Sequence, residues 1–191
     1  AENTQATITA VDNEEFALDA LMQKMKAKGL DNRISTLCAN MTNLPCEPAS
    51  FDLIWSEGSA YIMGVEAALK SWKPLLKEEG VLVLSDAVWS VESPRKETLA
   101  FWQHEYPDMA TAAARIKQAE AAGYELIDTF SLSDQAWQAY YFPLEARLNE
   151  LKEELYGSPV LDDLERELAV FHQRKDEFDY QMFIFKNSKI G

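Results

Sequence analysis

The sequence has little of what builds covalent or metal-bound scaffolds: among its 191 residues are two cysteines and two histidines. Cys38 and Cys46 are too few for a disulfide framework and lack the pattern of a metal site. The two histidines lie far apart in sequence, which argues against a zinc site. We therefore expect no metal, and a reduced, cytoplasmic environment is the simplest interpretation.

Long apolar runs and positive charge are also scarce. No run approaches the length of about 20 residues that a membrane-spanning helix needs, and no signal peptide is visible. The chain has 18 basic and 32 acidic residues, which gives a formal net charge of −14 and a pI near 4.5. Such a surface repels phosphate backbones and anionic lipids, so we expect neither nucleic acid nor a membrane as a partner.

What the sequence does contain is a regular alternation of two patterns. Its length and its hydrophobic fraction of 47% suit a single globular domain. Strands alternating with helices predict βα units and a parallel sheet. Strands are predicted at 6–12, 34–38, 51–55, 81–84, 124–130 and 177–186, and helices at 13–28, 65–76, 110–122, 134–156 and 161–175.

The stretch from Phe51 to Tyr61 organises the rest of the chain. An apolar run, Leu53-Ile54-Trp55, stops abruptly at Ser56-Glu57-Gly58. A buried strand that ends in this way is typical of the rim of a ligand crevice in an open α/β sheet, because loops diverge at the carboxyl ends of the strands.

Four features, in this order and spacing, carry a family resemblance over about residues 6 to 90. They are Val11-Asp12, Ala39-Asn40-Met41 followed by Asn43-Leu44-Pro45, the segment 51–58, and Leu75-Leu76-Lys77 with Gly80 and the strand 81–84. The chain resembles a class I S-adenosylmethionine-dependent methyltransferase. Its remainder resembles, more loosely, small-molecule methyltransferases of the ubiquinone-biosynthesis type.

The resemblance implies a doubly wound, Rossmann-like and mostly parallel sheet, with an antiparallel last strand preceded by a helical insertion. It also implies S-adenosylmethionine as cofactor and a small, apolar or aromatic acceptor. We expect one methyltransferase-like domain over residues 1–191, in which 88–109 and 134–177 are cover and insertion segments.

One departure concerns the family's first strand and glycine-rich loop, which should precede Ala6 and are absent from this sequence. We expect a chain truncated at its N-terminus that binds the cofactor poorly by itself. A sheet without its central strand exposes unpaired edges. We expect the edges at 6–11 and 53–55 to pair with each other, with a second chain, or with residues upstream.

The resemblance also implies cofactor-binding residues. Asp12, with its neighbour Asn13, would hold the ribose hydroxyls, although an Asp at this junction can equally cap the following helix. Asn40 and Met41 would hold adenine, the alternatives being a loop Asn and a core Met. Near the methionine part and the methyl group would lie the remaining candidates: Ser56, Glu57, Gly58 and Tyr61.

A catalytic base is needed only where the acceptor must lose a proton. The candidates are Glu57, Asp86 and His104, although a lone histidine is more often a surface residue. Aromatic side chains from the two cover segments would wall the acceptor pocket, with plain lid packing as the alternative. They are Trp89, Trp102, Tyr106, Trp137, Tyr140, Tyr141 and Phe142.

Two other functions stay open at this point. A nicotinamide-dependent oxidoreductase of the doubly wound type also places an acidic residue after its second strand. A non-catalytic interaction module would use the charged helices from Glu145 to Lys175, which we interpret first as solvated faces and second as a homodimer contact.

Overall fold

A computed structural model describes residues 1–188 and divides the chain into two compact units, Ala1–Pro48 and Ala49–Gly191. The N-terminal unit contains β1 (Ile8–Asp12), α1 (Glu15–Ala27), a 3₁₀ turn (Asp31–Arg33) and β2 (Ile34–Cys38). The two strands are parallel, and Asp12 is level with Cys38. This is the βαβ unit that the alternating pattern predicted.

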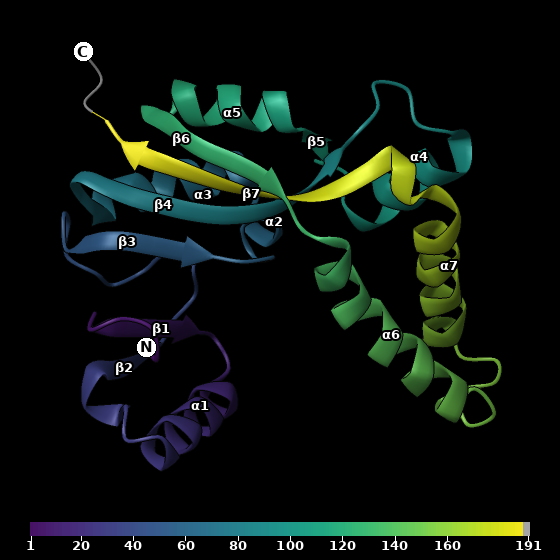
Figure 1. Ribbon diagram of the computed structural model, residues 1–191, viewed down its shortest axis with the longest axis horizontal. Helices are drawn as coiled ribbons and strands as arrows, with labels where there is room; N and C mark the ends of the chain where they lie inside the picture. Colours follow the sequence, from purple (N-terminus) through teal and green to yellow (C-terminus); the bar gives the residue numbers. More distant parts are fainter. Residues whose placement is uncertain (189–191) are drawn as a thin grey trace. The chain divides into compact units, whose positions relative to one another are not determined.

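The C-terminal unit is built on a sheet whose main strands run in the order β3-β4-β7-β6 (Figure 1). β3 is parallel to β4, and β7 is antiparallel to both β4 and β6. The predicted α/β fold with an antiparallel last strand is thereby confirmed. The strands are β3 (Phe51–Ser56), β4 (Leu76–Trp89), β6 (Tyr124–Ser131) and β7 (Phe178–Asn187), and the short β5 (Ala110–Thr111) pairs with the end of β4.

Helices fill the connections between these strands. α6 and α7, from the insertion predicted before the last strand, lie side by side (Figure 1), and α5 contacts β6 and α3. The helices are α2 (Ala60–Met63), α3 (Val65–Trp72), α4 (Lys96–Glu105), α5 (Ala112–Ala121), α6 (Asp134–Leu151) and α7 (Pro159–Arg174), with 3₁₀ turns at Lys73–Leu75 and Lys175–Glu177.

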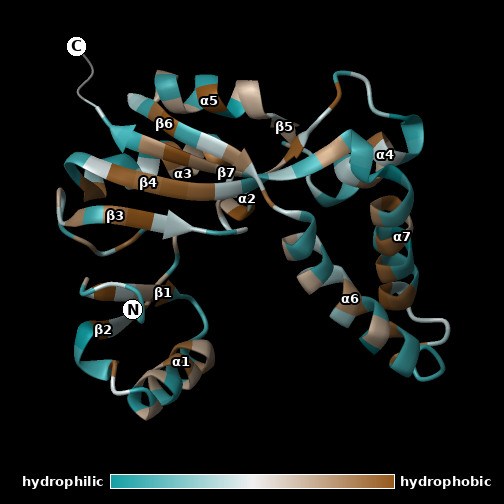
Figure 2. Cartoon of the chain, in the orientation of Figure 1, coloured by the Kyte–Doolittle hydropathy of each residue, from teal (hydrophilic) through white to brown (hydrophobic). Residues whose placement is uncertain are grey.

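The core of the C-terminal unit lies along β4 and β7, where hydrophobic residues concentrate (Figure 2). Leu82 and Leu84 of β4 and Phe183 of β7 have no exposed surface. Burying a side chain of this size stabilises the fold by about 1.5–3 kcal/mol. A sheet buried in this way holds the ends of its strands in fixed positions.

β4 is longer than the sequence pattern predicts. The expected turn at Lys77–Gly80 lies inside the strand as an irregularity, because the register with β3 shifts between Phe51 and Leu53. β4 then continues past Asp86 to Trp89, where it pairs with Phe178 of β7. The predicted long connection at 88–109 contains a further helix, α4, that the sequence reading did not resolve.

Among the described residues, β1 pairs with β2 and β3 pairs with β4, and the expected pairing of the edges at 6–11 and 53–55 with each other stays a prediction. Pairing with a second chain or with upstream residues stays a prediction, as does the single domain over 1–191. Over residues 1–188, no helix has the length and apolar character needed to span a membrane.

Candidate functional site

The C-terminal unit contains a cavity of about 490 Å³ lined by Gly58, from the loop that follows β3. β4 and β7 contribute its floor, and α4, α6 and α7 contribute further lining residues. Its walls are largely aromatic. The rings are Tyr61, Phe101, Trp102, Tyr106, Trp137, Tyr140, Tyr141 and Tyr180.

Five of the seven aromatic residues predicted to wall an acceptor pocket are among these. Trp89 and Phe142 are not: the Trp89 indole donates to the Met109 carbonyl at 3.1 Å, and Phe142 is 55% exposed. Sequence reasoning missed Tyr61 as a wall residue, since it assigned that ring to the methyl group, and it missed Tyr180. The Tyr180 position could have been found from the alternation of β7.

The loop after β3 is held close to the floor of the cavity. The Gly58 amide donates to the Ser85 hydroxyl at 3.0 Å, and the Ser56 and Ser59 hydroxyls are 2.7 Å apart. Gly58 has a φ of +58°, and a Cβ at this position would lie 2.8 Å from the Tyr180 hydroxyl. Both the backbone conformation and the space therefore require glycine.

A buried ion pair lies behind the cavity wall. Asp86 accepts from Arg115 Nε at 2.7 Å and from the Tyr106 hydroxyl at 2.9 Å. Both charged side chains are 1% exposed, and Arg115 also donates to the Asp108 carbonyl at 2.6 Å. Burial raises the pKa of Asp86, and the Arg115 guanidinium and the Tyr106 hydroxyl oppose that rise.

Because the Asp86 carboxylate already accepts hydrogen bonds from Arg115 and Tyr106, its role is to orient Tyr106 on the cavity wall. Burial, with the Asp86 charge, raises the pKa of Tyr106 and keeps its phenol protonated. Arg115 was missed by sequence reasoning, because an arginine in a predicted helix is ordinarily a solvated residue. Nothing local marks it as the partner of Asp86, which lies 29 residues away.

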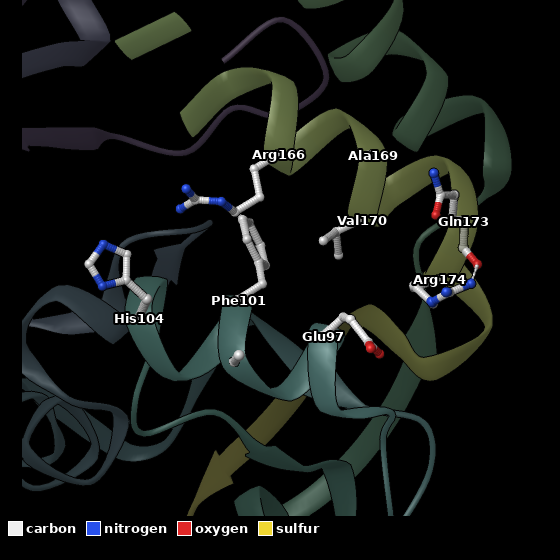
Figure 3. Close-up of a pocket in the computed structure, with 9 residues that line it drawn as sticks. Glu97, Phe101, His104, Arg166, Ala169, Val170, Gln173 and Arg174 are labelled. Carbon is white, nitrogen blue, oxygen red and sulfur yellow. Dashed lines mark hydrogen bonds between the residues drawn. The ribbon is translucent and has the colours of Figure 1, made fainter. Parts of the chain in front are cut away.

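The other two proposed bases lie elsewhere. Glu57 is exposed and accepts from the Trp55 indole at 2.5 Å. His104 is exposed on α4 and lines a different hollow, of about 400 Å³, between α4 and α7 (Figure 3). The structure thus brings Asp86, Gly58 and Tyr61 together around the aromatic cavity, and leaves Glu57 and His104 outside its lining.

Two further carboxylates line the aromatic cavity, Glu105 at the end of α4 and Glu167 in α7. The Tyr140 hydroxyl donates to Glu167 Oε1 at 3.5 Å. Burial raises the pKa of Glu167, the Tyr141 and Tyr140 hydroxyls oppose this, and the Glu105 charge adds to it. Sequence reasoning placed Glu167 on a solvated helix face, because the run around it is rich in charge.

In the N-terminal unit, the proposed nucleoside-binding residues lie at the ends of adjacent parallel strands. Asp12 ends β1, and its carbonyl accepts from the Ala39 amide at 2.9 Å, so Asp12 and Asn40 are neighbours. Asp12 Oδ1 accepts from the Glu14 amide at 2.9 Å, which is the cap contact of the alternative interpretation. Asn13 is exposed and Met41 is partly exposed.

The remaining hydrogen-bonding groups of Asp12 and Asn40 fit a nucleoside. Since Oδ1 of Asp12 accepts from the Glu14 amide, Oδ2 is the oxygen to which ribose hydroxyls would donate. Asn40 Oδ1 accepts from the Thr42 amide and hydroxyl, both at 2.9 Å. An adenine ring held by Asn40 would therefore meet the NH₂ group, which donates to an acceptor nitrogen, and not Oδ1, which the notional contact with the exocyclic amine requires.

The parallel βα arrangement and the antiparallel last strand agree with the fold that the family resemblance implied. Residues 1–80 match the family model described as a methyltransferase domain. A Haemophilus influenzae protein of unassigned function is 33% identical over 84 residues, which are 42% of this chain and 34% of that protein. The chain thus spans about a third of the length of this curated relative.

Solved structures extend the likeness over nearly the whole chain. A candidate sarcosine dimethylglycine methyltransferase from Galdieria sulphuraria has a TM-score of 0.76 at 19% identity, over 96% of this chain and 70% of that one. A methyltransferase from Geobacter sulfurreducens, solved with S-adenosylhomocysteine, has a TM-score of 0.72 at 11% identity, over 93% and 74%. The [4+2]-cyclase SpnF has a TM-score of 0.73 at 18% identity, over 98% and 68%. At sequence identities this low, the structural similarity shows that the fold is shared and nothing more.

Proposed function

We propose that this protein transfers a methyl group from S-adenosylmethionine to a small acceptor bound in the aromatic cavity. The observation that carries the proposal is the cavity itself, which lies beside Gly58 at the carboxyl end of β3 and has ligand-sized volume. The family match over residues 1–80 supports the choice of cofactor.

In the N-terminal unit, Asp12 and Asn13 bind the ribose, and Asn40 and Met41 bind adenine. In the C-terminal unit, the strand end at Ser56, Glu57 and Gly58 binds the methionine part. When bound, the cofactor supplies an electrophilic methyl group on a positively charged sulfur. The exposed Glu57 carboxylate suits a neighbouring positive charge, because the Trp55 indole holds it in one position.

The cavity residues orient the acceptor and exclude water from it. The Tyr61 ring contacts the Tyr106 ring edge-on, with centroids 5.3 Å apart, and Asp86 and Arg115 fix Tyr106 from behind. Held geometry in a dry pocket is the main contribution that a protein makes to a reaction of this kind.

Calorimetry with S-adenosylmethionine tests the proposal, on this chain and on any longer natural form of it. Asp12→Ala should weaken cofactor binding by roughly 1.5–3 kcal/mol, the range for a hydrogen bond to a charged group. Asp19→Ala, an exposed carboxylate on α1, is the matched control and should leave the dissociation constant unchanged. Absence of binding at millimolar cofactor in every form would exclude the proposal.

A second candidate function is a reaction other than methyl transfer in the same cavity. It is favoured by the likeness to the [4+2]-cyclase SpnF, since one fold carries different chemistries. Binding of S-adenosylmethionine without its conversion to S-adenosylhomocysteine, over a panel of acceptors, would support this candidate. Binding of NADH without any binding of S-adenosylmethionine would instead favour a nicotinamide-dependent oxidoreductase.

A further inference from the structure

The aromatic cavity carries charge of one sign. Glu105 and Glu167 are both among its lining residues, and within residues 1–188 no lysine, arginine or histidine is. The third carboxylate, Asp86, is neutralised by Arg115. His104 Nε2 lies 3.9 Å from Glu105 Oε1, but the His104 side chain is 74% exposed and lines the other hollow.

The rings around these carboxylates suit a positive charge. Seven of them belong to tyrosine and tryptophan, whose faces attract cations, and a desolvated cation over such a face gains about 2 kcal/mol. Several meet edge to face, as Tyr140 meets Tyr141 with centroids 4.8 Å apart. An anionic ligand would instead meet two carboxylates that repel it, although the indole N–H groups of Trp102 and Trp137 have no hydrogen-bond partner among the described residues.

Glu167 is the best-placed counter-ion. It is partly buried on α7 and accepts a long hydrogen bond, 3.5 Å, from Tyr140. Among the described residues no basic side chain forms an ion pair with it, although its helix neighbours Glu165 and Arg166 are both paired, with Lys152 and Asp163. A partly buried carboxylate without a counter-ion is costly, and a bound cation would remove that cost.

We propose that the acceptor bound in this cavity is a small amine in its ammonium form, with the aromatic rings around the cation and Glu167 as its counter-ion. That the ligand accepts a methyl group rests on the proposed function. The binding of a cation in the cavity does not depend on it. The proton of the bound ammonium passes to a Glu167 oxygen, and the nitrogen keeps the N–H electron pair as the lone pair that methylation requires. Burial of Glu167, which raises its pKa, favours this transfer.

Binding of matched small probes to the chain without cofactor tests the proposal by calorimetry. The probes are choline, its neutral isostere 3,3-dimethylbutan-1-ol and the anion 3,3-dimethylbutanoate. Choline should bind at least about ten-fold more tightly than the neutral isostere, and the anion should not bind. Glu167→Gln should weaken choline binding about ten-fold and leave the neutral isostere unaffected.

Glu165→Gln, on the same helix and paired with Lys152 at the surface, is the control and should bind choline as the parent does. Equal binding of choline and its neutral isostere, or undiminished choline binding by a folded Glu167→Gln, would overturn the proposal. Cofactor binding without choline binding would overturn this inference alone. Choline binding without cofactor binding would overturn the methyltransferase proposal and leave the cation site standing.

Discussion

Two constraints act on Gly58: its left-handed backbone conformation and the space beside the Tyr180 hydroxyl. A side chain here costs about 1–2 kcal/mol for the left-handed conformation, and its Cβ would also meet the Tyr180 hydroxyl at 2.8 Å. We expect Gly58→Ala to lower the free energy of unfolding by about 1–3 kcal/mol more than Gly157→Ala. Gly157 has a φ of +76° with no atom near an added Cβ, so it isolates the backbone cost. Urea unfolding measures both.

The contact with Tyr180 can be removed separately. Tyr180→Phe in the Gly58→Ala background should recover most of the excess loss, because the atom that meets the new methyl group is the phenol oxygen. If Gly58→Ala and Gly157→Ala lose equal free energies of unfolding, and Tyr180→Phe restores none of it, then the loop after β3 moves away from Tyr180 without a cost in stability.

The partly buried Glu167 should make the stability of the fold depend on pH. Burial raises its pKa above the usual 4.5, so the folded state binds the proton more tightly than the unfolded state. This contribution to stability is therefore present below pH 4.5 and is lost as the pH rises through the folded-state pKa. Glu167→Gln should be more stable than the parent at pH 7, and the difference should vanish below pH 4.5. Thermal unfolding of both proteins over a range of pH measures this difference in stability. A difference that does not change with pH would contradict the raised pKa of Glu167.

At the scale of elements, Arg115 joins α5 to β4 and to the segment after α4. Removing one partner of a buried ion pair leaves the other charge uncompensated, which costs about 3–5 kcal/mol. We expect Arg115→Met to lower the free energy of unfolding by that amount. Arg166→Met, whose partner Asp163 is 56% exposed, should change it by less than about 1 kcal/mol. Similar small losses in both variants, measured by denaturant unfolding, would show that the buried pair does not hold these elements.

At the scale of the whole molecule, β3 ends its sheet within the described residues and exposes apolar side chains. Leu53 is 48% and Trp55 59% exposed. An edge of this kind invites pairing with another chain, so we expect association that rises with concentration in light scattering. Leu53→Lys should reduce it, whereas Val160→Lys, a similarly exposed apolar position on α7, should not. A monomer at every concentration would exclude edge pairing between copies.

The sequence by itself determined the alternation of strands and helices and the aromatic cover, whereas the antiparallel last strand was implied by the family resemblance. The first two depend on local patterns: apolar runs make strands, helical spacing makes helices, and the end of Leu53-Ile54-Trp55 at Ser56-Glu57-Gly58 marks a crevice. Local patterns also placed Asp12 at the end of one strand and Asn40 just after the next strand along the chain, and the structure pairs these two strands.

Only the tertiary structure decided which polar groups meet. Arg115 reaches Asp86 across 29 residues of sequence, and Glu167 lines a cavity with Tyr61, which lies over a hundred positions earlier. The bulge in β4 likewise depends on its pairing with β3. A residue's own neighbours in sequence set its backbone preference, but burial and charge pairing depend on what packs against it, and that is decided by the fold.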